Sequence, residues 1–169
     1  MIAVVKGYEE VYYFQGGIPE WRYFNYPLTI GEKWQQTKVA KISPLEFKEI
    51  LDTKMDIFLL DVRSLDQLTL SRKDYVFTMD NSTLAGNYIN GARHCPLVYL
   101  EESYHLIPKD RRIIITDWIM KQSTIAAKFL TMKGYHVIGV LKGGTMRWQT
   151  EGLPVIEGDD TLRRQLLCD

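Results

Sequence analysis

The stretch RIIITDWIMKQSTIAAKFL, residues 112–130, decides the fold of this 169-residue chain. Its three isoleucines, 113–115, form a short, β-branched, uninterrupted run, which predicts a strand covered on both faces in a parallel sheet. After a short loop, Ser123 is expected to cap a helix that ends at Gly134. A strand, a tight loop and a helix N-terminus place backbone N–H groups around the carboxyl end of the strand. Such a cradle would make a cysteine nucleophilic, but the residue at this point is Asp117.

The rest of the chain repeats this alternation of strand and helix. The tetrapeptide Ser43-Pro44-Leu45-Glu46 combines an N-cap serine, a first-turn proline and a capping-box glutamate, and predicts a helix to about Leu51. Strands are expected at Ile57 to Leu60 and at Val137 to Leu141. This alternation favours an α/β fold with a largely parallel sheet.

An ordered series of segments resembles the rhodanese family, the sulfurtransferases of sulfane sulfur. The resemblance spans about residues 42–156 and implies a rhodanese-like three-layer α/β/α domain with a mainly parallel sheet. It also implies that Asp61 and Arg63 support the active loop. The segments that carry it are Leu59-Leu60-Asp61-Val62-Arg63-Ser64, Ile89-Asn90-Gly91-Ala92, Cys95-Pro96-Leu97, Gly134-Tyr135, Leu141-Lys142-Gly143-Gly144, Trp148 and Gly152-Leu153-Pro154.

The sequence departs from the family pattern at the active loop itself. The family's loop opens with the nucleophilic cysteine and continues with two variable residues, often a glycine, one further residue, an arginine and a serine. The corresponding residues here are Asp117, Trp118, Ile119, Met120, Lys121, Gln122 and Ser123. A carboxylate cannot carry a transferable sulfur atom, so the resemblance predicts a catalytically inactive domain. Its predicted role is that of a binding, regulatory or structural module in a tandem, sulfurtransferase-related protein.

The residues of the loop leave other readings open. Asp61 and Asp117 both end predicted strands and could form a Mg²⁺-assisted phosphoacceptor site, although no third carboxylate stands beside them. Lys121 could instead pair with Asp117 in a structural turn. Trp118 and Met120 could fill the anion pocket or form an exposed recognition patch. The favoured prediction is that the loop, 117–123, binds an unknown protein or a small anion, with no cofactor and no metal.

The other reactive side chains supply no alternative centre. His94, His105 and His136 are scattered and show no metal-ligand spacing. Two cysteines give no disulfide framework. Cys95 matches an apolar core position, which predicts a buried, unreactive thiol. Cys168 is the penultimate residue and is expected to be accessible but not catalytic.

An internal repeat predicts a second copy of the domain. Residues 1–28 are interpreted as the C-terminal fragment of an upstream rhodanese-like repeat, with a strand at 11–14. In that case the upstream repeat would hold its own active loop, and the parent protein could be an active thiosulfate or sulfane-sulfur sulfurtransferase. The fragment's apolar side chains need a partner surface, either the complete domain or a second chain in a homodimer through residues 1–28. The repeat consists of Gly7, Tyr8, Gly16, Gly17, Trp21 and Pro27, which recur 127 residues later as Gly134, Tyr135, Gly143, Gly144, Trp148 and Pro154.

Length and composition bound the remaining organisation. With 46% hydrophobic residues, a chain of 169 residues can bury one good core and not two. We predict a linker at 29–41, one rhodanese-like domain at 42–156 and a tail at 157–169 that packs back on the domain. An insertion at about 69–86 is either a lid over the pocket or a neutral surface loop.

Charge and hydropathy argue against two classes of partner. The chain has 21 basic and 21 acidic residues, so no global field favours nucleic acid or an anionic membrane. Its apolar runs are too short for a membrane span. Residues 1–5 are too short for the core of a signal peptide. The compartment cannot be assigned from the sequence.

Overall fold

The computed structural model describes residues 31–53, 55–63 and 87–157, together with five isolated residues nearer the N-terminus. Two compact units are present, Met1–Glu32 and Lys33–Asp169, and the fold below is that of the second. The predicted strand at 11–14, the insertion at 69–86 and the tail beyond Glu157 lie outside the described residues. The domain boundaries and the upstream repeat therefore stay predictions.

Five parallel strands form the central sheet, in the order β1-β5-β4-β2-β3. Strand β4 lies in the middle, where β2 and β5 flank it and helices cover both of its faces. Its three isoleucines are consequently inaccessible to solvent. The strands predicted at 113–115, Ile57 to Leu60 and Val137 to Leu141 are confirmed. The observed bounds are β1 (Lys41–Ile42), β2 (Ile57–Asp61), β3 (Arg93–His94), β4 (Arg112–Thr116) and β5 (Val137–Leu141).

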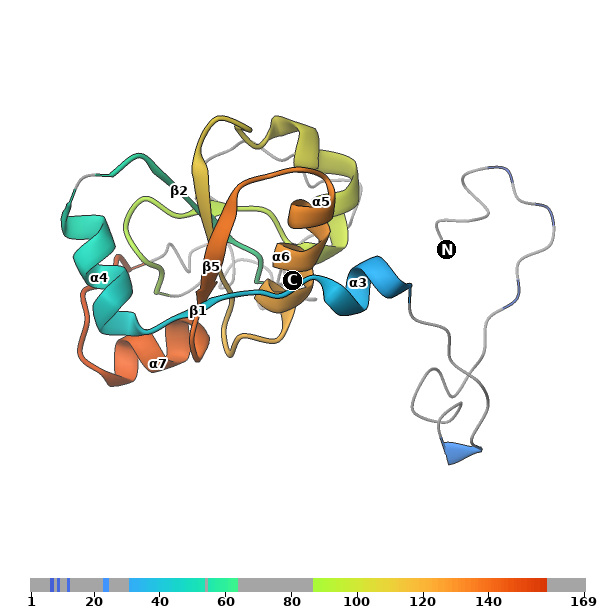
Figure 1. Ribbon diagram of the computed structural model, residues 1–169. Helices are drawn as coiled ribbons and strands as arrows, with labels where there is room; N and C mark the ends of the chain where they lie inside the picture. The colour runs from blue at the N-terminus through green and yellow to red at the C-terminus, as the bar shows by residue number, and fades with distance from the viewer. Residues whose placement is uncertain are drawn as a thin grey trace, which may run out of the picture. The chain divides into compact units, whose positions relative to one another are not determined.

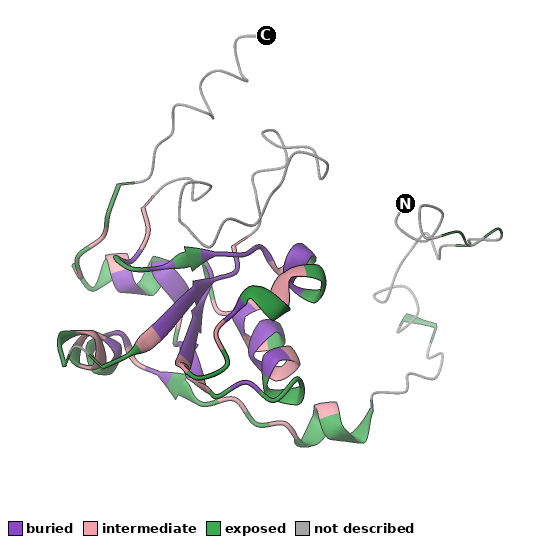
Figure 2. Ribbon diagram, turned by 90° about the horizontal axis from the view of Figure 1, so that it is seen from above, coloured by how far each residue is buried: buried purple, intermediate pink, exposed green. Residues whose placement is uncertain are grey.

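Helices cover both faces of the sheet and give the expected three layers (Figure 1). Helices α4 (Pro44–Asp52) and α7 (Gly144–Thr150) lie on one side, and α5 (Leu97–Ser103) and α6 (Gln122–Met132) lie on the other. The short helices α3 (Glu32–Gln36) and η1 (Tyr104–Leu106) complete the described elements. Figure 2 shows the buried strands between these layers, with exposed residues on the outer sides of the helices.

Each face of the sheet has its own apolar cluster, because side chains alternate along a strand. Ile114 packs on the side of α4 and α7, where the rings of Phe47 and Trp148 lie 5.5 Å apart between centroids. Ile113 and Ile115 pack on the opposite side with Leu130 of α6. Strand β4 is therefore held from both faces, and it provides a rigid base for the loop at its carboxyl end.

The helix termini test the capping predictions. The capping box of α4 is confirmed, since the Ser43 hydroxyl accepts from the Glu46 N–H and the Glu46 carboxylate accepts from the Ser43 N–H. The prediction for α6 was wrong at its start. Ser123 lies inside the helix, which begins at Gln122. The helix ends at Met132 and is followed by Gly134 with a positive φ of 84°, as predicted.

Within the described part of the chain, the helices are all too short or too polar to cross a membrane.

Candidate functional site

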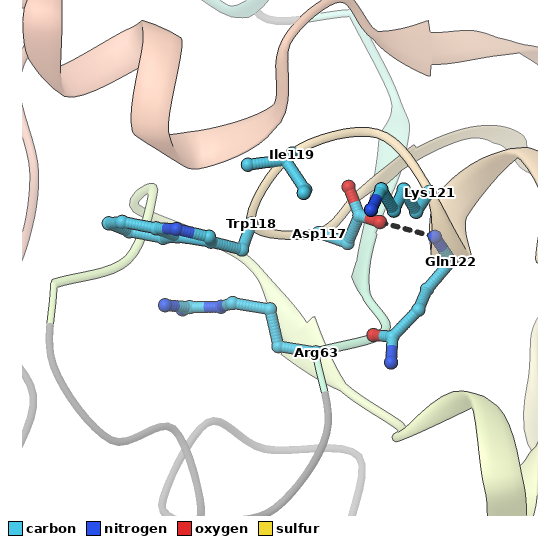
Figure 3. Close-up of a pocket in the computed structure, with 6 residues that line it drawn as sticks. All are labelled: Arg63, Asp117, Trp118, Ile119, Lys121 and Gln122. Carbon is cyan, nitrogen blue, oxygen red and sulfur yellow. Dashed lines mark hydrogen bonds between the residues drawn. The ribbon is translucent and has the colours of Figure 1, made fainter.

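A pocket of about 390 Å³ opens at the carboxyl edge of the sheet, above β2 and β4 (Figure 3). The two strands pair in register from Ile57 with Arg112 to Asp61 with Thr116, so the residues that follow them emerge side by side. This register brings the predicted supporting residue and the predicted loop together. The pocket is lined by Arg63, Asp117, Trp118, Ile119, Lys121 and Gln122.

The Asp117 carboxylate fills the cradle that the sequence predicts for a nucleophile. The side chain is buried, with 2% of its surface exposed. One carboxylate oxygen accepts from the Met120 N–H and the Ser123 hydroxyl. The other accepts from the N–H groups of Gln122 and Ser123 at 2.5 and 3.1 Å, and Figure 3 marks the first of these bonds. Asp117 thus satisfies the first amides of α6, which is the capping role that the sequence assigned to Ser123.

The loop keeps a left-handed residue although it has lost the glycine of the family pattern. Met120 stands at that position with a φ of 66°. For a residue other than glycine, this left-handed backbone conformation costs about 1–2 kcal/mol. Two contacts offset the cost, because the Met120 N–H donates to Asp117 and the Met120 side chain packs against the apolar cluster beneath α6. Met120 therefore packs against the core, partly buried, and it is not among the residues that line the pocket.

Helix α7 holds the other side of the loop. The N–H groups of Thr145 and Met146 donate to the carbonyl oxygens of Asp117 and Trp118 at 2.8 and 3.1 Å. Gly144 has a φ of 65°, and a Cβ at this residue would lie 2.4 Å from both of those oxygens. Only glycine allows so close an approach. The N–H groups and the carbonyl groups of the loop are thus both engaged, which fixes its backbone.

Asp61 holds Arg63 in place. Its buried carboxylate accepts from the Arg63 backbone N–H and Nε, and it forms an ion pair with Nη2 at 2.9 Å. Arg63 also donates from Nη1 to the Asn87 carbonyl oxygen. Both strand-end carboxylates, Asp61 and Asp117, are thus engaged in hydrogen bonds within the domain, which argues against a phosphoacceptor site. The described residues contain no cluster of three or more acidic, His or Cys side chains that could hold a metal.

His94 supports this arrangement from β3. Its Nε2 donates to the Arg63 carbonyl oxygen at 2.8 Å. Burial lowers the pKa of His94, while the hydrogen bond to Arg63 and the charge of Asp61 oppose that shift. The neutral imidazole therefore fixes the segment that carries Arg63. Sequence analysis found no pattern for His94, because its partner is 31 residues away in the chain.

The remaining predicted side chains have distinct positions. Lys121 is exposed, and among the ion pairs of the described residues none joins it to Asp117, so the loop is held by amides and not by a salt bridge. Cys95 is fully buried, which confirms its expected core position, and burial raises its pKa to about 12, which argues against a reactive thiol. Cys168 lies outside the described residues. The contacts of Thr145 and Met146 with the loop were not predicted. The preceding Gly143-Gly144 pair, which indicates a turn, was the available signal.

Comparisons with known proteins show the same architecture. A family model for the rhodanese-like domain matches residues 43–151. A sulfurtransferase of Allochromatium vinosum is 30% identical over 100 residues, which cover 57% of this chain and 92% of that protein.

Two solved structures share the fold at low sequence identity. A rhodanese-related protein from Thermoplasma volcanium has a TM-score of 0.52 at 21% identity, over 69% of this chain and 96% of that one. A thiosulfate sulfurtransferase from Pseudomonas aeruginosa has a TM-score of 0.52 at 20% identity, over 72% of this chain. The match spans only 21% of that longer enzyme.

Proposed function

The chain belongs to the family of rhodanese-like domains, and we propose that it is a binding domain that has lost sulfur-transfer chemistry. One observation carries the proposal. The Asp117 carboxylate stands where the family pattern has cysteine, and it accepts the hydrogen bonds of the surrounding amides. Sulfur transfer through this loop needs a thiol that can hold sulfur as a persulfide. A carboxylate cannot form one.

The one thiol among the described residues, that of Cys95, does not offer a substitute. Cys95 is inaccessible to solvent, and a pKa of about 12 leaves almost no thiolate near neutral pH. Its side chain lies in the apolar cluster between the sheet and α6. Both features argue against a relocated nucleophile at this position.

The geometry favours a protein partner over a small anion. An anion would need the amides of the cradle, and those amides already donate to Asp117. The apolar side chains that reach solvent are instead those of Trp118 and Ile119, on a loop fixed by Asp117 and by α7. A rigid loop loses little conformational freedom on binding. Tryptophan is also among the residues that contribute most to protein interfaces.

A second candidate rests on the 127-residue repeat in the sequence. The parent protein would be an active sulfurtransferase, with its cysteine in the upstream repeat and this domain in a supporting role. The sequence that precedes Met1 tests it. A cysteine 127 residues before Asp117, opening a loop with glycine and arginine, would favour the enzyme.

A thiosulfate:cyanide sulfurtransferase assay of the purified chain tests the proposal, with Asp117→Cys as the matched variant. We expect no thiocyanate from the native chain, and no gain of a sulfur atom in its intact mass. Turnover that survives both Cys95→Ser and Cys168→Ser would show that sulfur transfer does not need a cysteine of this chain. Turnover abolished by either substitution would reveal a relocated thiol. Either result would overturn the proposal.

A further inference from the structure

Two exposed apolar side chains, Trp118 and Ile119, line the pocket, and we call these two together with the exposed Met146 of α7 the apolar patch. Their exposed fractions are 48, 39 and 43%. The backbone joins Met146 to the loop, because the Met146 N–H donates to the Trp118 carbonyl oxygen at 3.1 Å. Figure 3 shows the Trp118 indole and the Arg63 side chain projecting in the same direction from neighbouring segments. The patch therefore borders the pocket that Arg63 lines.

The negative and positive side chains at the pocket differ in how far they are exposed to solvent. The negative groups, Asp61 and Asp117, are buried and accept hydrogen bonds within the domain. The Arg63 side chain is only 13% exposed and its charge is paired with Asp61, whereas the positive charge of Lys121 is exposed to solvent. Among the described residues, no acidic side chain forms an ion pair with Lys121. The formal charge of the chain is zero, so this positive edge is a local property.

The size of the pocket limits what can enter it. Its volume of about 390 Å³ is at the lower end of the roughly 300–1,000 Å³ typical of small-ligand pockets. Such a pocket accepts a few side chains of an extended segment and not a broad globular surface. Because the pocket has apolar side chains beside a positive edge, complementary side chains are apolar and acidic.

We propose that the pocket and the apolar patch bind an extended peptide segment of a partner protein, in which an apolar or aromatic side chain is flanked by Asp or Glu. The apolar side chain covers Trp118 and Ile119, and the carboxylate pairs with Lys121. This inference rests on the proposed function, because a loop free of catalytic demands can keep its pocket for a partner.

A peptide-display selection against the immobilised full chain tests the inference, with counter-selection on the Trp118→Ser variant. We expect the enriched peptides to share an apolar residue next to Asp or Glu. A labelled peptide from this set should bind at least about tenfold more weakly to Trp118→Ser, as for an interface hot spot. Lys121→Glu should weaken the same peptide and shift the selection toward basic sequences, and added salt should weaken binding to the native chain.

Two matched variants control for general surface effects. Leu45→Ser removes an exposed apolar side chain from α4, and Lys38→Glu reverses an exposed charge ahead of β1. Both residues lie outside the pocket, so both variants should bind the labelled peptide like the native chain. Far-UV circular dichroism should show that Trp118→Ser keeps its fold, because the indole is exposed.

Four outcomes would overturn the inference. In the selection, these are the absence of enriched peptides and the enrichment of peptides without acidic residues. In the binding assay, it is an affinity that neither Trp118→Ser nor Lys121→Glu changes. In sedimentation, it is a dimer that Trp118→Ser dissociates. The last outcome would assign the patch to a second copy of the chain. Failure of the proposed function is detected by a different experiment, because the sulfurtransferase assay would then show thiocyanate production whether or not a peptide binds.

Discussion

Replacing Asp117 by alanine tests whether the carboxylate organises the loop. The native side chain accepts four hydrogen bonds, three from backbone N–H groups and one from the Ser123 hydroxyl. Alanine removes every acceptor while the donors stay. We therefore expect Asp117→Ala to destabilise the whole domain and not only the loop.

The magnitude follows from the donors that lose their partner. Loss of a helix cap costs about 1–2 kcal/mol, and a buried unsatisfied donor such as the Ser123 N–H costs about 1–3 kcal/mol. The bonds from Met120 and Gln122 are only part-buried, and their loss is already counted with the cap. The expected total is about 3 kcal/mol, a large share of a domain stability of roughly 5–15 kcal/mol.

Urea denaturation followed by far-UV circular dichroism measures this loss. The midpoint should fall while the slope stays unchanged, because the native surface is the same. At roughly 4 °C per kcal/mol for a domain of this size, the melting temperature should fall by about 12 °C. Asp52→Ala is the matched control. That carboxylate is exposed and pairs with Lys48 on α4, so its loss should cost less than about 0.5 kcal/mol.

A second arm tests the cradle directly. The truncated side chain leaves space beside the free amides, so sodium formate should restore part of the stability of Asp117→Ala, and sodium chloride at the same ionic strength should not. If Asp117→Ala unfolds within about 0.5 kcal/mol of the native chain, the carboxylate does not hold the loop. The reasoning behind the proposed function would then fail with it.

The other predictions concern the cradle, its supports and pH. Asp117→Cys, made together with Cys168→Ser, should be alkylated by iodoacetamide with a midpoint well below the free-thiol value of about 8.5, because the helix N-terminus favours thiolate; a midpoint near 8.5 would refute the cradle. Gly144→Ala should destabilise the domain by more than Gly152→Ala in urea denaturation; both have positive φ, but only a Cβ at Gly144 would meet backbone oxygens. Equal losses would show that the loop and α7 can move apart. Burial lowers the pKa of His94, so below about pH 6.5 the unfolded chain binds a proton more readily than the native one, and stability should fall as pH falls. Thermal melts between pH 7.5 and 5.5 should show a shallower fall for His94→Gln, and an unchanged slope would contradict this.

The fold could be predicted because its main signals are local. The isoleucine run of β4 and the capping box of α4 each lie within a few residues, and both elements form where these patterns place them. The start of α6 could not be predicted in the same way. Ser123 is a favoured capping residue, but the cap of this helix is Asp117, five residues before Gln122. That contact depends on Met120 adopting a conformation that is uncommon for a side chain other than glycine.

The contacts between the loop and α7 could not be predicted from the sequence for a related reason. The approach of Gly144 to Asp117 joins residues 27 apart in the sequence, and it becomes visible only once β4 and β5 lie side by side. The Gly143-Gly144 pair indicates a turn, but a turn does not say which backbone it touches.

The three replacements in the loop have one physical explanation. Amides around a cysteine stabilise an anion that forms during a reaction, whereas Asp117 supplies an anion that is always present. The hydrogen bonds of the cradle then stabilise the fold, and they offset the strain of Met120 in place of glycine. Under the proposed function the loop binds no anionic sulfur donor, and it then has no need of an arginine at the position of Gln122. Met120 and Gln122 thus become tolerable once Asp117 is in place, so stability effects of restoring the family residues should be non-additive across these positions.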